Sequence, residues 1–165
     1  MHSVILTSFG GLDALELAEL PEPAVPAGGE VVNVRAVALG PWDLATADGY
    51  FAPLGGSAVF PQVAGWDFAG ETASGRRVLG FTAQPWMGTG ALAERIAVPG
   101  ALLAPLPDGL DWAQGAALPV SVLTARLLLQ AASVPDGGLV LVTGAAGMVG
   151  GVSSVALACG DGLRR

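Results

Sequence analysis

The sequence has 165 residues, 52% of them hydrophobic, with seven arginines, no lysine and 14 acidic side chains, so its formal net charge is −7 at pH 7. A chain of this length can bury a sizeable core, either as one domain or as one domain with part of another. The negative charge argues against nucleic acids and anionic membranes as partners.

A single cysteine, Cys159, and a single histidine, His2, limit the metal and redox chemistry of the chain. One cysteine cannot form an internal disulfide, and residues 1–7 lack the basic and apolar regions of a signal peptide, so we predict a cytoplasmic protein. One cysteine and one histidine cannot complete a conventional zinc site, so the sequence predicts no zinc.

The first two thirds of the chain have the pattern of short strands separated by glycine and proline turns. Strands are predicted at residues 3–9, 15–20, 30–39, 77–81 and 91–98. In the third of these, the alternation predicts one apolar face made of Val32, Val34, Ala36 and Ala38. Pro41 stands near the start of one or two helical turns at residues 42–47.

From Asp111 onward the apolar residues recur with a helical period. Asp111 is a predicted N-cap for a helix over residues 112–118, and Pro119 breaks or kinks that helix. Residues 121–132 form a second predicted helix, followed by a linker at residues 135–138. Strands followed by helix, strand and helix predict a β-rich domain and then the start of an α/β domain.

Residues 139–151 hold the pattern around which the chain is organised. Residues 139–142 are an unbroken apolar run, typical of a parallel strand buried on both faces. Gly144, Gly147 and Gly150 follow at every third position, and the uncharged stretch to Cys159 predicts a helix. Such a strand, turn and helix form the first half of a dinucleotide site, because glycine lets the backbone approach a pyrophosphate at the helix N-terminus. An ordinary tight turn between a strand and a helix is the alternative.

Residues 137–160 carry no charge and are numerous enough to span a bilayer, but their glycines and their division into a strand half and a helix half disfavour a membrane span. A Rossmann sheet needs further strands, and the residue that binds the cofactor ribose lies about 20 residues beyond the glycines, near Arg164. We therefore expect an incomplete enzyme or one half of a split one, with an unpaired strand at residues 139–142 that invites association.

Seven stretches spread over nearly the whole chain resemble, in this order, the zinc-independent quinone oxidoreductase branch of the medium-chain dehydrogenase/reductase superfamily, which also contains polyketide enoyl reductases. They are residues 10–17, 40–43, 64–70, 90–94, 116–120, 123–125 and 142–150. The resemblance implies a mainly β, GroES-like barrel as the N-terminal catalytic domain over residues 1–125. It implies the first β-α unit of an incomplete, truncated Rossmann domain over residues 126–165.

The same resemblance implies a zinc-free oxidoreductase that transfers a hydride from NADPH to a quinone or a carbonyl-activated alkene, with NADH as an open alternative. Tyr50 matches a loop tyrosine that protonates the substrate after hydride addition, a pocket-wall aromatic being the alternative. Thr124 matches a position near the nicotinamide, or is a helix hydroxyl bonded to a carbonyl. The implied cofactor-binding turn consists of Gly144, Ala145, Ala146, Gly147, Met148, Val149 and Gly150.

The chain departs from the family pattern in three places. Gly40 stands where the family commonly has asparagine, Met148 replaces a residue that is usually small, and residues 70–77 lack the usual loop. Asp43 and Asp67 are interpreted as structural carboxylates rather than catalytic ones.

Two function classes follow from these patterns. The first is an oxidoreductase by descent that acts on a small-molecule substrate, is inactive as the isolated chain, and needs a second chain to supply the missing Rossmann half. The rival is a non-catalytic GroES-like binding or assembly module, or a gene fragment. An adjacent reading frame encoding the missing strands would favour the first.

Overall fold

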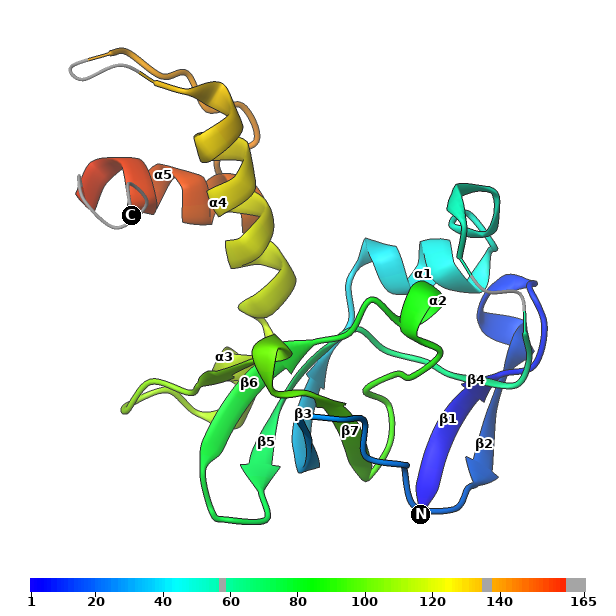
Figure 1. The fold of residues 1–165 in the computed structure, drawn as a ribbon. Coiled ribbons are helices and arrows are strands. Elements are labelled where there is room, and N and C mark those ends of the chain that lie inside the picture. Colours follow the sequence, from blue (N-terminus) through cyan, green and yellow to red (C-terminus); the bar gives the residue numbers. More distant parts are fainter. Residues whose placement is uncertain (57–58, 135–137, 160–165) are drawn as a thin grey trace. The chain divides into compact units, whose positions relative to one another are not determined.

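The structure, a computed structural model, describes residues 1–56, 59–134 and 138–159. It divides into two compact units, Met1–Ala117 and Leu118–Arg165, which are described one at a time (Figure 1). Residues 135–137 of the predicted linker and Arg164, the predicted ribose position, lie outside the described residues.

The first unit contains two antiparallel sheets (Figure 1). In the smaller sheet, β1 (His2–Leu6) lies between β2 (Leu15–Glu19) and β4 (Gln62–Val63). The larger sheet has the order β7-β3-β5-β6-β8. Its strands are β3 (Gly29–Ala38), β5 (Asp67–Thr72), β6 (Arg77–Phe81), β7 (Arg95–Pro99) and β8 (Leu103–Pro105). The five predicted strands therefore form, but the strand predicted at residues 91–98 begins only at Arg95, and the one predicted at residues 3–9 ends at Leu6.

The core of this unit lies on one face of the larger sheet. Its buried members are Val32, Phe68, Val78, Ala91, Ile96 and Val98, and Val34, Val37 and Leu103 pack against them. The predicted apolar face of β3 is therefore partly wrong. A bulge between Val34 and Ala36 inserts Arg35 into the strand, and this extra residue brings Val37, rather than Ala36 and Ala38, to the core face.

Besides short 3-10 turns, the described part of the first unit contains three short α-helices. They are α1 (Pro41–Ala47), α2 (Gln84–Met87) and α3 (Trp112–Ala116). The predicted N-cap is confirmed, because the Asp111 carboxylate accepts a 2.7 Å hydrogen bond from the amide of Gln114. Gly115 brings α3 close to the sheet, where its Cα faces Leu106 and Ala69. Helix α3 thus covers the face of β5 opposite the core, and β5 is buried on both sides.

The second unit consists of α4 (Pro119–Ala132) and α5 (Met148–Cys159), which pack against each other. Pro119 is in the first turn of α4, where its missing N–H leaves no hydrogen bond unmade, so it starts this helix. The predicted strand at residues 139–142 is wrong: these residues have no regular secondary structure and belong to no sheet, and Leu139 and Leu141 are almost fully exposed. A strand forms only with a partner, and the described residues of this unit supply none.

Candidate active site

The glycine turn of the second unit has a geometry that favours glycine at two of its positions. Gly144 has a φ of +68°, in the left-handed region. The Gly147 amide then donates to the Gly144 carbonyl at 2.9 Å and closes the turn. A Cβ on Gly150 would overlap that same carbonyl oxygen, so glycine there lets the turn lie directly against the first turn of α5.

This close packing presents backbone amides at the N-terminus of α5. Met148, Val149 and Gly150 form its first turn, where no preceding carbonyl of the helix accepts from their amides. The two serines of the next turn bind back to the helix: Ser153 Oγ donates to the Val149 carbonyl at 2.8 Å and Ser154 Oγ to the Gly150 carbonyl at 2.9 Å. The turn holds no side chain at Gly144, Gly147 or Gly150, the arrangement that in dinucleotide-binding turns lets the backbone approach a pyrophosphate.

Thr124 lies on α4 in the same unit and is half-buried. Thr124 and the seven turn residues therefore belong to the same unit, in which α4 and α5 pack against each other. Tyr50 belongs to the first unit.

Tyr50 follows α1, and its side chain is 66% exposed. Its amide donates to the Ala45 carbonyl at 2.9 Å, which fixes the backbone at the end of the helix. Its ring meets Phe51 edge to face with the centroids 5.3 Å apart, and Phe51 in turn contacts Trp86 of α2 at 5.4 Å. The sequence patterns did not single out Phe51 or Trp86. The signal that could have found them is the lack of any charged residue over residues 49–66 and 78–93, the segments that hold them.

The start of α1 is held by Asp43. Its Oδ2 accepts a 2.7 Å hydrogen bond from the Gly40 amide, the structural contact predicted for this carboxylate. Burial raises the pKa of Asp43 above its ordinary value, and hydrogen bonds from the backbone of Gly40 and Trp66 oppose that rise. Asp67, also interpreted as structural, is buried on β5.

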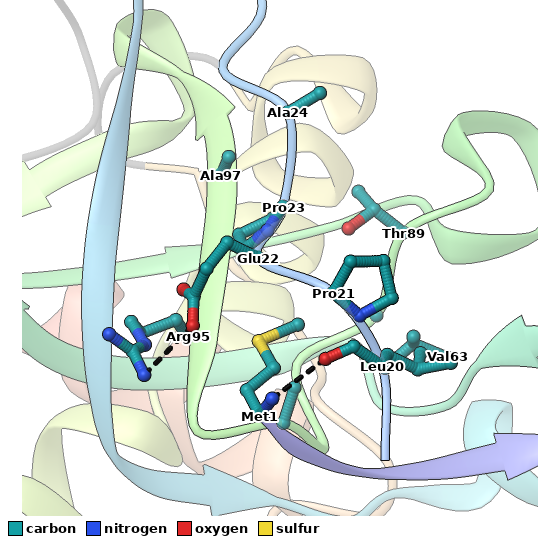
Figure 2. Close-up of a pocket in the computed structure, with 12 residues that line it drawn as sticks. Met1, Leu20, Pro21, Glu22, Pro23, Ala24, Val63, Thr89, Arg95 and Ala97 are labelled. Carbon is teal, nitrogen blue, oxygen red and sulfur yellow. Dashed lines mark hydrogen bonds and ion pairs between the residues drawn. The ribbon is translucent and has the colours of Figure 1, made fainter. Parts of the chain in front are cut away.

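A separate pocket of about 320 Å³ lies in the first unit (Figure 2). Residues 20–24 form one side of it, and Thr89, Arg95 and Ala97 contribute to the other. The charged groups that line the pocket interact with other residues that line it. The Met1 ammonium donates to the Leu20 carbonyl at 2.7 Å, and Arg95 forms an ion pair with Glu22 at 3.0 Å. None of the predicted site residues lines this pocket, so it is not the predicted site.

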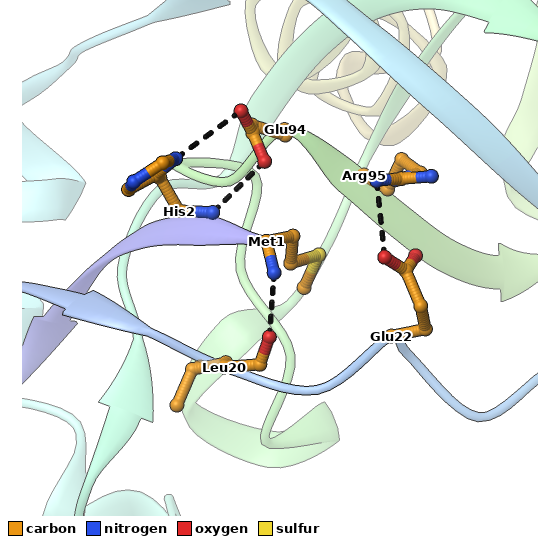
Figure 3. A network of polar contacts seen from close by, with 6 residues as sticks. All are labelled: Met1, His2, Leu20, Glu22, Glu94 and Arg95. Carbon is orange, nitrogen blue, oxygen red and sulfur yellow. Dashed lines mark hydrogen bonds and ion pairs between the residues drawn. The ribbon is translucent and has the colours of Figure 1, made fainter.

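Beside the pocket, His2 and Glu94 form a second polar contact (Figure 3). The His2 amide donates to Glu94 at 2.9 Å, and this bond, with the nearby His2 ring, holds the pKa of Glu94 below its ordinary value. No group of three or more metal-binding side chains occurs among the residues that the structure describes. In the same residues, no helix is long and apolar enough to cross a membrane.

Comparison with known proteins identifies relatives along most of the chain, although no protein-family model matches it. A zinc-type alcohol dehydrogenase-like protein of Schizosaccharomyces pombe is 31% identical over 85% of this chain and 44% of its own length. A chloroplastic NADPH-dependent alkenal/one oxidoreductase of Arabidopsis thaliana is 30% identical over 91% of this chain and 42% of its own.

A solved structure gives a similar result. The quinone oxidoreductase of Thermus thermophilus, whose structure includes a complex with NADPH, has a TM-score of 0.79 and 38% identity, covering 97% of this chain and 51% of its own. This chain spans about half the length of the relatives it matches. The likeness confirms the expected fold class, a GroES-like β domain followed by the first part of a Rossmann unit. Along most of its length the chain is similar to quinone oxidoreductase-like members of the medium-chain dehydrogenase/reductase superfamily.

Proposed function

We propose that this chain carries the catalytic domain and the pyrophosphate-binding turn of an NADPH-dependent oxidoreductase that reduces a quinone or a carbonyl-activated alkene without zinc. The observation that carries the proposal is the turn at Gly144 to Gly150, whose packing tolerates no side chain at Gly150. The relatives' names support the reaction class, since they include a quinone oxidoreductase and an alkenal/one oxidoreductase.

The residues divide into two roles. A bound nicotinamide cofactor would supply the hydride. The amides of Met148, Val149 and Gly150, with Ala145 and Ala146 beside them, would hold its pyrophosphate at the positive end of α5. Gly144 and Gly147 shape that turn, and Thr124 is the proposed contact near the nicotinamide.

Tyr50 is the proposed proton donor to the oxygen or carbon that becomes basic once the hydride has added. An exposed phenol suits this role because water can return the proton to it after each turnover. Because the reaction would then need only positioning and a proton donor, it requires no metal ligand from this chain. Metal analysis of the purified chain should find no stoichiometric zinc, and one tightly held zinc per chain would contradict that part of the proposal.

Partner and location remain predictions. We propose that the remaining strands of the nucleotide-binding sheet come from further sequence or from a second chain, and that the 165 residues alone do not turn over substrate. The predicted cytoplasmic location also remains open, since the similar proteins include a chloroplastic and a mitochondrial one.

A chimera tests the function directly. Residues 1–159 of this chain would be fused to the part of the Thermus thermophilus enzyme that this chain does not match, and NADPH oxidation would be followed with a quinone and with an alkenal. We expect reduction of at least one substrate. A folded chimera that binds NADPH but reduces neither would contradict the oxidoreductase function and favour a non-catalytic module.

A further inference from the structure

The pocket in the first unit, of about 320 Å³, is large enough for a small molecule (Figure 2). Small-molecule sites usually have volumes of roughly 300–1,000 Å³. All the residues that line this pocket belong to the first unit, and none of them is a proposed catalytic or cofactor-binding residue. What the pocket binds is therefore a question separate from the proposed function.

One side of the pocket is the face of β7 that points away from the core. Ile96 and Val98 belong to the core, whereas Arg95 and Ala97, which alternate with them along the strand, line the pocket. The side chain at position 97 is a single methyl group, so the strand leaves this volume unfilled. A valine at that position would occupy part of it.

The opposite side, the loop at residues 20–24, is fixed at two points. The Leu20 amide donates to the Met1 carbonyl at 2.9 Å, and Glu22 forms an ion pair with Arg95 at 3.0 Å (Figure 3). Two prolines in this loop restrict its backbone further. Because the loop is held in place without a ligand, binding a ligand would require little additional ordering of it.

The charged side chains of the pocket favour an anionic ligand. Arg95 lies on a strand of the larger sheet and its guanidinium has five N–H donors, more than one carboxylate can use. Glu22 lies on the loop and its side chain is 58% exposed, and such an exposed ion pair contributes little to stability. The nearby Glu94 does not line the pocket and accepts from the His2 amide at 2.9 Å. An anion can therefore replace Glu22 at little cost.

We propose that this pocket binds a short aliphatic monocarboxylate, whose carboxylate pairs with the Arg95 guanidinium in place of Glu22. The planar guanidinium can donate two parallel hydrogen bonds to a carboxylate, which makes this pairing strong and specific. The hydrocarbon chain would lie against the apolar lining, which includes Leu20, Pro21, Pro23, Val63, Ala93 and Ala97. This site is additional to the proposed active site and does not depend on it.

The test is a titration of the ¹⁵N-labelled 165-residue chain with sodium hexanoate at pH 7, followed by the backbone amide resonances. Hexanamide, which has the same carbon chain without a charge, is titrated in parallel at the same ionic strength. We expect the resonances of Thr89, Gly90 and Arg95 to shift. Hexanamide should bind at least tenfold more weakly, because it forms no charge-assisted pair with the guanidinium. Equal affinity for the two compounds would overturn the proposal.

Two variants of the pocket should weaken hexanoate binding. Arg95→Gln removes the guanidinium and should raise the Kd about tenfold or more. Ala97→Val fills part of the cavity at a strand position, where a β-branched residue is favoured, and should raise the Kd several-fold. Circular dichroism verifies the fold of each variant. An unchanged Kd in either folded variant would contradict the site.

Glu22→Gln tests whether the ligand replaces Glu22. Removing this competing carboxylate should lower the Kd for hexanoate several-fold. A higher Kd would show that the ligand needs the ion pair intact, which would overturn the proposal.

Arg76→Gln is the matched control. Arg76 forms an ion pair of the same kind with Glu30 at 2.6 Å, its side chain is 53% exposed, and it does not line the pocket. This variant should leave the Kd for hexanoate unchanged. An equal rise in Kd for Arg76→Gln and Arg95→Gln would show that only the overall charge of the chain matters, and the assignment of the site would be wrong.

Discussion

The indole of Trp42 occupies the space that a side chain at position 40 would fill. Gly40 has an extended backbone that any residue adopts, yet a Cβ built there would overlap the indole ring. The glycine is therefore required by its neighbour two residues along and not by its own conformation. This pairing accounts in physical terms for the departure from the family's common asparagine at position 40.

Gly40→Asn should destabilise the first unit by about 1–3 kcal/mol, because the new side chain is forced against a packed ring. Trp42→Ala alone should also destabilise it, since the large ring leaves a cavity. The double variant Gly40→Asn/Trp42→Ala should lose less folding free energy than the two single variants lose together, because the asparagine side chain then enters the space that the indole has left. Urea unfolding followed by tryptophan fluorescence measures this cycle, since the remaining tryptophans all lie in the first unit. Strict additivity would show that the two positions do not compete.

Asp43 should make the stability of the first unit depend on pH in a specific direction. Its raised pKa means that the folded chain binds this proton more tightly than the unfolded chain does. The stabilisation is complete below the ordinary value of 3.8 and is lost as the pH rises through the raised pKa. Asp43→Asn keeps an oxygen for the Gly40 amide and carries no charge, so its stability relative to the unmodified chain should increase from about pH 3.5 to about pH 7.

Two further variants serve as controls for the pH dependence expected of Asp43→Asn. Asp108→Asn makes the same chemical change at an exposed turn and is the matched control. Asp43→Ala removes the acceptor for Gly40 and should cost about 1 kcal/mol. A relative stability of Asp43→Asn that falls as the pH rises would contradict the assignment.

Comparing Gly150→Ala with Gly151→Ala distinguishes the contribution of the glycine turn to NADPH binding from the effect of an alanine on the stability of α5. The Cβ at position 150 would overlap the Gly144 carbonyl, whereas at position 151 the nearest atom, the Ala145 oxygen, would be 3.4 Å away. In the chimera, Gly150→Ala should raise the Kd for NADPH about tenfold or more. Gly151→Ala should leave it unchanged and stabilise α5 by up to about 1 kcal/mol, because alanine favours helix. Equal effects of the two on calorimetric NADPH binding would show that the turn does not shape the pyrophosphate site.

Tyr50→Phe in the chimera should lower turnover by about 10²–10⁴-fold while NADPH affinity stays nearly the same. Steady-state kinetics and calorimetry measure these effects. An unchanged turnover would show that water is the proton source and that Tyr50 only lines the site.

The isolated 165-residue chain should bind NADPH weakly or not at all and show no reductase activity. A helix dipole at an exposed site contributes only about 0.3–1 kcal/mol, and even millimolar binding needs about 4.1 kcal/mol. Hydrogen exchange should find the β-sheets of the first unit protected and residues 139–142 exchanging freely, since they have no strand partner. Micromolar NADPH affinity in a monomer, with residues 139–142 protected, would contradict this prediction.

The sequence predicted features that depend on neighbours along the chain. The cap at Asp111, the end of its helix before Pro119 and the helix after Gly147 all form as expected, because each depends on local backbone chemistry. Features that need a distant partner were harder to predict. The run at residues 139–142 has the composition of a buried strand but no strand beside it. The contact between Phe51 and Trp86 joins the segment after α1 to α2, and no local pattern connects these two parts of the chain.

The bulge at Arg35 has a consequence for how chain length can vary in evolution. Val32, Val34 and Val37 face the core although their spacing is two residues and then three, and Arg35 is the extra residue that permits it, its side chain pairing outward with Glu71 at 3.6 Å. If Arg35 were deleted, the three valines would be two residues apart throughout and would still point inward from a regular strand. This strand can therefore gain or lose one residue while its buried side chains stay in place, and homologues that differ by a single-residue gap here should share the same core.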